Sequence, residues 1–160
     1  MATAHRFEDL IAWQLSEAVK EEVFRLTSRE RVRRDTRFCD DIQRSARSAP
    51  ANIAEGFGRF EPKPNANYVS IAKASLEETR NHTYDGFKRN HFDIVERDEL
   101  LQLLKRAIVA TTRLLRYLKS CKQAPSGNIK ARTRDPEPGN PEPGNKNPRN
   151  RRNPRTREPS

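Results

Sequence analysis

Apolar residues recur every three or four positions along four long segments of the chain, a spacing typical of amphipathic helices. The first predicted helix covers about residues 8–27, and its apolar face consists of Phe7, Leu10, Ile11, Leu15, Ala18, Val19, Val23 and Leu26. The third runs from Asn65 or Asn67 to about Arg89, after a break at Pro62 and Pro64, and its inner face consists of Tyr68, Ile71, Ala72, Ser75, Leu76, Thr79, Thr83 and Phe87. The fourth begins at a capping-box-like pair, and its face consists of Leu100, Leu104, Ala107, Ile108, Thr111, Leu115 and Leu118.

The second predicted helix, residues 38–59, is rich in small residues and carries Pro50 in its interior. A proline there has no N–H for the carbonyl of Ala46, and its ring crowds that carbonyl, so we expect the helix to kink or break. Arg47, Asn52 and a bound water are candidates to satisfy the freed carbonyl.

The end of this helix has its own pattern. Glu55 and Arg59 follow one another at i, i+4 spacing, acid before base, which is the favourable order for a pair on a helix surface. Gly56 and Gly58 are expected to stop the helix. We interpret Asn52, Glu55 and Arg59 as residues that hold the bend and the helix end, with contact to a ligand or partner as the alternative.

Several motifs resemble those of a known family. FEDLIAWQ at residues 7–14, DDIQRSA at 40–46, SAPANIAEGFGR at 48–59 and IAKASLEE at 71–78 resemble, in order and spacing, bacterial four-helix-bundle proteins named for the 23S rRNA intervening sequences that often encode them. The resemblance covers about residues 7–120. Ser45 and Arg47 depart from the family pattern, and so does everything in the C-terminal tail.

The resemblance implies a four-helix protomer that assembles as a ring, commonly a homopentamer. The chain is more distantly similar to the accessory protein of diversity-generating retroelements, which works with a reverse transcriptase and its RNA, so a reverse transcriptase is a candidate partner. We therefore expect residues 1–122 to form an all-α, antiparallel up-and-down four-helix bundle with a Pro-kinked second helix. Residues 123–160 are expected to form a separate tail.

The tail differs from the rest in composition. It is rich in proline, glycine and asparagine and holds two tandem copies of PEPGN, at Pro136–Asn140 and Pro141–Asn145. Such a segment cannot bury a core, so we expect disorder, partly as extended polyproline II. Its basic end, Lys146–Arg157, suits contact with nucleic acid without sequence preference. Translation of repetitive DNA, with no function for the product, is an equally good explanation.

Charge and cysteine content narrow the class of partner and the compartment. The net charge of +10 and a pI near 10.1 indicate a polyanion partner but do not choose between RNA, DNA and an acidic protein. Cys39 and Cys121 lack a CxxC or Cys/His spacing, which favours reduced thiols in a cytoplasmic protein. We find no long apolar stretch and no signal-peptide core, so we expect a soluble protein with no membrane partner.

The densest basic patch lies between the first two helices. SRERVRRDTR, residues 28–37, supplies arginines suited to bidentate contact with phosphate, and Arg44 and Arg47 on the next helix extend the set. The alternative is a solvated loop. The candidate nucleic-acid-binding residues are Arg29, Arg31, Arg33, Arg34, Arg37, Arg44 and Arg47. Asp35 or Thr36 is predicted to cap the helix that follows.

Two weaker features complete the set of candidates. Arg113, Arg116, Lys119 and Lys122 recur every three residues near the end of the fourth helix, where they suit the negative end of the helix dipole and form a secondary basic stripe. Trp13 and Phe24 fall off the apolar face of the first helix. They mark an oligomer seam or, alternatively, edge positions covered by a neighbouring helix.

Catalysis finds no support in the pattern. The carboxylates Glu77 and Glu78 lack an ExxH partner on another helix, and His82 and His91 lack a companion at metal-ligand spacing. We therefore expect no metal, no cofactor and no enzymatic activity.

Two hypotheses follow. The preferred one is a homo-oligomeric accessory protein that binds nucleic acid, RNA rather than DNA, through its basic patches. The other is a protein-assembly scaffold whose ring binds another protein, with no direct role for nucleic acid.

Overall fold

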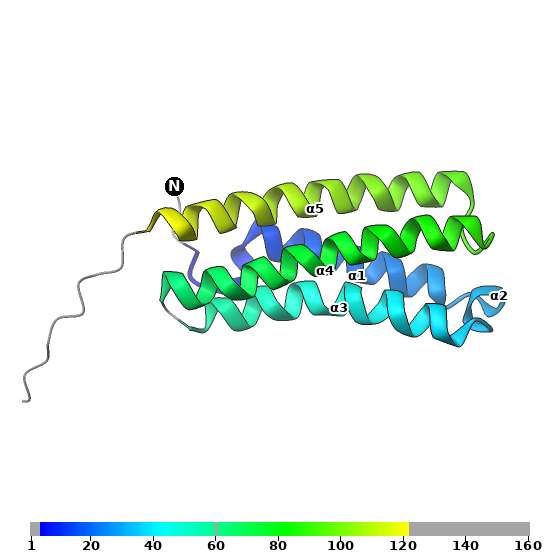
Figure 1. The fold of residues 1–160 in the computed structure, drawn as a ribbon, viewed down its shortest axis with the longest axis horizontal. Coiled ribbons are helices and arrows are strands. Elements are labelled where there is room, and N and C mark those ends of the chain that lie inside the picture. The colour runs from blue at the N-terminus through cyan, green and yellow to red at the C-terminus, as the bar shows by residue number, and fades with distance from the viewer. Residues whose placement is uncertain (1–3, 60, 122–160) are drawn as a thin grey trace, which may run out of the picture. The chain divides into compact units, whose positions relative to one another are not determined.

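The computed structural model describes residues 4–59 and 61–121, and these residues form an all-α four-helix bundle. The four long helices are α1 (Ile11–Thr27), α3 (Thr36–Phe57), α4 (Pro62–Lys88) and α5 (Ile94–Ser120). A 3-10 turn, η1 (Phe7–Asp9), precedes α1, and a single-turn helix, α2 (Glu30–Arg33), lies between α1 and α3. Consecutive long helices run in opposite directions (Figure 1), which confirms the predicted up-and-down arrangement. The predicted tail, residues 123–160, lies outside the described residues.

Each long helix packs against two others. Contacts join α3 to α4, α4 to α5, α1 to α3 and α1 to α5, so the helices form a closed square in chain order. Most of the buried side chains form one core cluster, which consists of Val19, Val23, Leu26, Val32, Phe38, Cys39, Ile42, Ala46, Ala49, Leu76, Phe92, Leu100, Leu104 and Ala107. Among the described residues, no helix is both long and apolar enough to span a bilayer.

The pair α3 and α4 is joined through small hydroxyl-bearing side chains. Ser75 Oγ donates to Ser48 Oγ at 2.8 Å, and Thr79 Oγ1 lies 2.9 Å from Ser45 Oγ. Ser45 and Thr79 are fully buried or nearly so. Ser45, Ser75 and Thr79 also lie within hydrogen-bond distance of carbonyls on their own helices. These pairs form a hydroxyl ladder between the two helices, and their small volume lets the backbones approach closely.

Helix α3 continues through Pro50 without a break. The proline is buried inside the helix. The amide of Asn52 donates to the carbonyl and hydroxyl of Ser48, at 2.8 and 3.1 Å, rather than to the carbonyl of Ala46 as proposed above. Asn52 therefore stabilises the turn that contains the proline, but its acceptor, Ser48, lies two positions after the expected one, Ala46.

The start of α4 corrects one prediction. We expected Pro62 and Pro64 to end any helical path, but both lie in the first turn of α4, with Glu61 as its N-cap. Backbone N–H groups of a first helical turn have no partner within the helix, so a proline there loses nothing and its fixed φ favours the helix. The prolines therefore begin the third long helix rather than delay it.

Two residues predicted to be buried are not. Ile11 is 61% exposed and Ile71 is 49% exposed. Ile11 is the first residue of α1 and is exposed although its neighbour Ala12 is buried, and Ile71 lies on the outer side of α4, whereas Val69 of the same helix is fully buried. A periodic pattern gives the width of an apolar face but not which of its edges a neighbouring helix covers.

Candidate nucleic-acid interface

The corner between α1 and α3 carries five of the candidate arginines, and a single buried side chain anchors it. Val32 of α2 is fully buried in the main core, and its carbonyl accepts from the Cys39 thiol at 3.3 Å. The backbone N–H groups of Val32 and Arg33 both donate to the carbonyl of Arg29, each at 2.9 Å. Because Val32 faces the core, Arg31 and Arg33 on either side of it face the solvent. The loop that was the alternative for this segment is instead a short ordered helix.

Asp35 connects the start of α3 to the residues that follow α4. Its carboxylate accepts from the backbone N–H of Phe38 at 3.2 Å, which confirms the predicted cap of α3. The same carboxylate lies 3.0 Å from His91 Nε2 and 3.2 Å from an Arg89 nitrogen. Its pKa is held below the usual value, first by the hydrogen bond from His91 and then by the backbone of Phe38. The side chain of His91 is 13% exposed and packs on the ring of Phe38, with 4.9 Å between the ring centroids.

The loop between α4 and α5 faces the same corner. Asn90 has φ of 59°, a left-handed conformation that asparagine tolerates better than most residues. The backbone N–H of His91 then donates to the carbonyl of Gly86 at 2.8 Å and so closes the end of α4. A Cβ at Gly86 would lie 2.5 Å from the Phe92 ring and 2.7 Å from that of Phe38, so this turn leaves no room for a larger residue.

The candidate arginines fall into two groups when their partners are compared. Arg29 pairs with Glu96, Arg34 with Glu30, and Arg44 with Asp41. Within the described residues, no carboxylate pairs with the other candidates of the set, Arg31, Arg33, Arg37 and Arg47, all of which are exposed. Three of these four, Arg31, Arg33 and Arg37, lie on the corner itself. Their positive charge is therefore available to a ligand.

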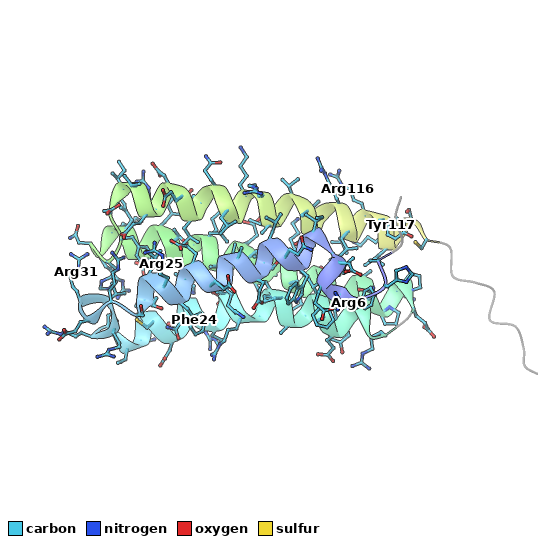
Figure 2. The ribbon with its side chains drawn as sticks, turned by 180° about the vertical axis from the view of Figure 1, so that it is seen from behind. Arg6, Phe24, Arg25, Arg31, Arg116 and Tyr117 are labelled. Atoms are coloured by element: carbon cyan, nitrogen blue, oxygen red, sulfur yellow. The ribbon has the colours of Figure 1, made fainter. Side chains whose placement is uncertain are left out.

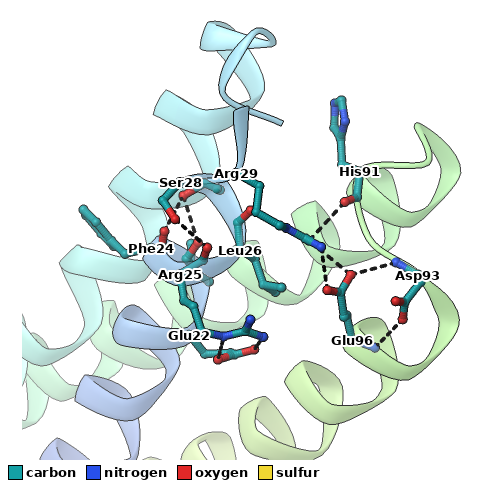
Figure 3. A network of polar contacts seen from close by, with 11 residues as sticks. Glu22, Phe24, Arg25, Leu26, Ser28, Arg29, His91, Asp93 and Glu96 are labelled. Atoms are coloured by element: carbon teal, nitrogen blue, oxygen red, sulfur yellow. Dashed lines mark hydrogen bonds and ion pairs between the residues drawn. The ribbon is translucent and has the colours of Figure 1, made fainter. Parts of the chain in front are cut away.

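Arg29 differs from the other candidates because its side chain points across to Glu96 and the His91 carbonyl (Figure 3). Its guanidinium donates to both oxygens of Glu96, at 2.6 and 3.1 Å, and to the backbone carbonyl of His91 at 3.3 Å. Arg31 donates to the same carbonyl, also at 3.3 Å. Glu96 in turn completes the predicted capping box with Asp93 at the start of α5.

The secondary basic stripe lies at the opposite end of the bundle. Arg113, Arg116 and Lys119 are exposed on the second half of α5, whereas Lys122 lies outside the described residues. Figure 2 shows Arg116 and Arg31 near opposite ends of the helices. The structure therefore does not bring the two basic sets together, and Lys119 instead lines a hollow of about 290 Å³ with Lys63 and Asn67.

The residues of the family motif mainly hold the turn between α3 and α4. Arg59 donates to Glu55 at 2.7 Å and to the Tyr68 hydroxyl at 2.8 Å, which confirms the predicted pair and adds a third member. Gly56 packs directly on α4, because a Cβ there would lie 2.7 Å from Asn65 Oδ1 and 2.9 Å from Tyr68 Cβ. Gly58 caps α3, as expected.

The two aromatic residues proposed as a seam are half-buried. Trp13 packs edge-on against Phe7, with 5.2 Å between the ring centroids, and Phe24 is partly covered on the other half of α1. The large apolar side chains that are most exposed are others: Ile11, Ile71, Tyr84, Ile94, Val95, Val109 and Tyr117. No contact in the structure tests the seam, which stays a prediction.

Metal and thiol chemistry add nothing to the site. In residues 4–59 and 61–121, no group of three or more His, Cys, Asp and Glu side chains is placed to hold a metal ion. Glu77 pairs with Arg80, and Glu78 lies 3.7 Å from His82. Cys39 is buried, and burial raises the pKa of its thiol, which keeps it protonated and unreactive.

Sequence reasoning missed the partners of the arginines. The sequence marks Glu96 only as a helix cap, and no pattern connects either Glu96 or the His91 carbonyl to the basic segment. Arg29 and Glu96 are 67 positions apart, and no local pattern signals such a pair. Arg89 was also missed, although it lies within the same network.

The fold and this corner define a class: an all-α four-helix-bundle protein with a basic corner formed by α2 and the start of α3. The chain belongs to the 23S rRNA-intervening sequence protein family, whose model matches residues 8–112. This match spans α1, α3, α4 and most of α5, and it ends just before Arg113, the first residue of the secondary stripe. A comparison with curated proteins found no match. The more distant similarity to the retroelement accessory protein stays a prediction.

Proposed function

We propose that this protein is a non-enzymatic, homo-oligomeric accessory protein of the cytoplasm that binds structured RNA, or an RNA–protein complex, through the α2–α3 corner. The observation that carries the proposal is the exposed, uncompensated charge of Arg31, Arg33 and Arg37. An arginine fork donates two parallel hydrogen bonds to a phosphate, and each phosphate that is neutralised releases counterions from the nucleic acid.

The shape of the corner favours RNA over DNA. Arg31 and Arg33 lie on the four-residue helix α2 and Arg37 lies in the first turn of α3, so the three form a compact cluster at one corner and not a stripe along one helix that could read a DNA major groove. Structured RNA is recognised through phosphates and shape, which a compact cluster of guanidinium groups suits. An assembly of several copies, such as the homopentamer expected above, would multiply this modest patch into a surface of higher avidity.

One observation favours the second function, a scaffold for protein assembly. A groove of about 260 Å³ between the start of α1 and the second half of α5 is lined mostly by apolar residues: Leu10, Ile11, Ala12, Ala110, Arg113 and Leu114. Exposed apolar surface of this kind suits a protein partner, which for this chain is another copy of itself or a second protein such as a reverse transcriptase.

Two matched triple variants separate these functions. Arg31→Gln, Arg33→Gln and Arg37→Gln together should weaken binding of a structured RNA about 100-fold near 0.1 M salt, because three phosphate contacts are lost. The control, Arg113→Gln, Arg116→Gln and Lys119→Gln, removes the same charge from the opposite end and should cost less than about fivefold. The slope of log affinity against log salt should fall by about 2 in the first variant only.

The full chain, purified free of nucleic acid, is the material for this experiment. Equal losses in both triple variants would mean that only net charge matters. Unchanged binding in both would remove both basic sets from the binding surface, and a wild-type chain without salt-dependent RNA binding would favour the scaffold. A third variant with the basic residues of Lys146–Arg157 replaced by serine tests the tail, and binding that disappears with those charges would contradict a binding surface on the bundle.

A further inference from the structure

Arg29 uses its donors within the protein and so cannot serve a ligand as its neighbours can. Besides Glu96 and the His91 carbonyl, it reaches the carbonyl of Leu26 through Nε at 3.2 Å. The side chain is 37% exposed and that of Glu96 is 16% exposed, so the pair is sheltered compared with Arg34 and Glu30, at 78% and 74%. A phosphate would have to compete with a bidentate carboxylate to reach Arg29.

The His91 carbonyl is the point at which Arg29 meets a residue of the proposed binding surface. That carbonyl accepts from both Arg29 and Arg31, each at 3.3 Å. The ring of the same residue contacts Asp35, which caps α3. The α4–α5 loop therefore contacts the residue that begins α2, Arg29 (Figure 3), and through the His91 ring it also contacts the start of α3.

These contacts bring two basic segments together that are far apart in sequence. Lys88, the last residue of α4, and Arg89, which follows it, are both exposed. Arg89 lies 3.2 Å from Asp35 at the corner and 2.9 Å from Asp85 one turn earlier, so its charge is compensated and it holds the end of α4, with Lys88, at the corner that Arg31 joins from the α2 side. Ordering flexible basic side chains before binding reduces the conformational entropy that is lost on binding.

We propose that Arg29 is a positioning residue: through Glu96 and the His91 carbonyl it holds α2 against the α4–α5 loop, so that Arg31, Arg33 and Lys88 present one phosphate-binding surface. This inference rests on the proposed RNA-binding function and removes Arg29 itself from the residues that touch the ligand. It adds Lys88, which the basic segment alone does not contain, and leaves Arg89 as a second residue that holds the corner, through Asp35 and Asp85.

The variant Glu96→Gln tests the proposal because a positioning role and a direct phosphate contact by Arg29 predict opposite changes in RNA affinity. Glutamine keeps an amide oxygen for the N–H of Asp93, so the cap of α5 can persist, but it removes the ionic partner of Arg29. A positioning role predicts RNA binding about fivefold weaker, a typical size for coupling between contacting residues. This weakening would occur although the loss of a carboxylate raises the net charge of the protein by one. A direct phosphate contact by Arg29 predicts tighter binding, because a competing carboxylate is gone.

Glu99→Gln is the matched control. Glu99 lies one turn further along α5, is exposed, and has no ion pair in the part of the chain that the structure describes. Its replacement makes the same change in net charge and should leave binding unchanged or slightly tighter. Binding by Glu96→Gln that equals or exceeds that of Glu99→Gln would overturn the positioning role.

A second variant guards against loss of the fold. Arg29→Lys keeps the charge, but an ammonium group cannot hold both Glu96 oxygens and the His91 carbonyl in the same way as the planar fork. The positioning role predicts binding weakened a few-fold, and unchanged binding overturns it. Circular dichroism of each variant checks the helices. If the wild-type protein shows no salt-dependent RNA binding, the proposed function itself fails and this inference fails with it.

Discussion

The two ends of the bundle are both basic, yet they are built differently. At the end formed by α2 and the α4–α5 loop, Arg29 and Arg89 bind carboxylates that come from other parts of the chain, Glu96 and Asp35, although Arg89 also binds Asp85 on α4. At the opposite end, Arg59, which directly follows the C-cap of α3, pairs with Glu55 four residues earlier and with Tyr68 of α4.

This difference shows what a basic run in a sequence can and cannot indicate. A count of arginines treats every residue of the α2–α3 corner alike. In the folded protein some arginines join helices and others face solvent, and only the second group has charge to offer a ligand. Distant carboxylates decide which arginine belongs to which group.

The largest loss of stability is expected at Gly86 and Gly56, one at each end of the bundle, where the backbone lies closest to neighbouring side chains. Gly86→Ala and Gly56→Ala should each lower the free energy of unfolding by about 1–3 kcal/mol, because the added methyl group overlaps aromatic rings in one case and Asn65 with Tyr68 in the other. Gly58→Ala is the control, since its Cβ would meet only Glu55 O at 3.5 Å and Ala54 O at 3.9 Å, which are ordinary van der Waals contacts. It should change stability by less than about 0.5 kcal/mol. Urea unfolding measures all three, and equal effects would contradict the close approach.

A smaller loss of stability is expected when Arg29 or Arg59 is replaced, and the loss should differ between the two. Arg29→Met should lower the free energy of unfolding by about 1 kcal/mol, because it breaks a half-sheltered pair between distant elements. Arg59→Met should cost less than Arg29→Met, since Glu55 lies only four residues away and both side chains are about half exposed, so solvent screens the pair. Chemical denaturation of the two variants checks the order. A larger loss in Arg59→Met would reverse the comparison between the ends.

The smallest effect concerns pH. The pKa of Asp35 is lower in the folded protein than its ordinary value of 3.8, so its ionised form stabilises the fold above that pH. This contribution should disappear as the pH falls through the folded-state pKa. Asp35→Asn keeps a capping side chain but not the charge, so the stability difference from wild type should shrink between pH 7 and pH 3. Thermal melts at several pH values test this, and a constant difference would contradict it.

Sequence reasoning succeeded wherever the deciding residues are near one another in the chain. The capping box of Asp93 and Glu96, the cap at Asp35 and the pair Glu55–Arg59 all act within one turn of helix, and the structure contains each of them. The four long helices were predictable for the same reason, because periodicity is local. The family motif then supplied the arrangement that periodicity alone could not.

Two of the failures share a physical cause, because the deciding residues lie far apart in the chain. Whether Ile11 and Ile71 are buried depends on which side of their helix a neighbouring helix covers, and whether Arg29 is free depends on a glutamate 67 positions away. Pro62 and Pro64 were misjudged for a different reason. A proline breaks a helix in its interior but suits its first turn, and the pattern did not show where that turn begins.

The hydroxyl ladder between α3 and α4 bears on how freely these two helices can slide. Ser45, Ser75 and Thr79 each have an acceptor on their own helix, so a shift of α4 by one turn, about 5.4 Å, would leave none of these three donors stranded. What such a shift would lose is the two cross-helix bonds, each worth about 1 kcal/mol net. The ladder therefore favours the observed register of α3 and α4 but does not forbid the neighbouring ones. The close packing at Gly56 and Gly86, rather than these hydrogen bonds, excludes the neighbouring registers.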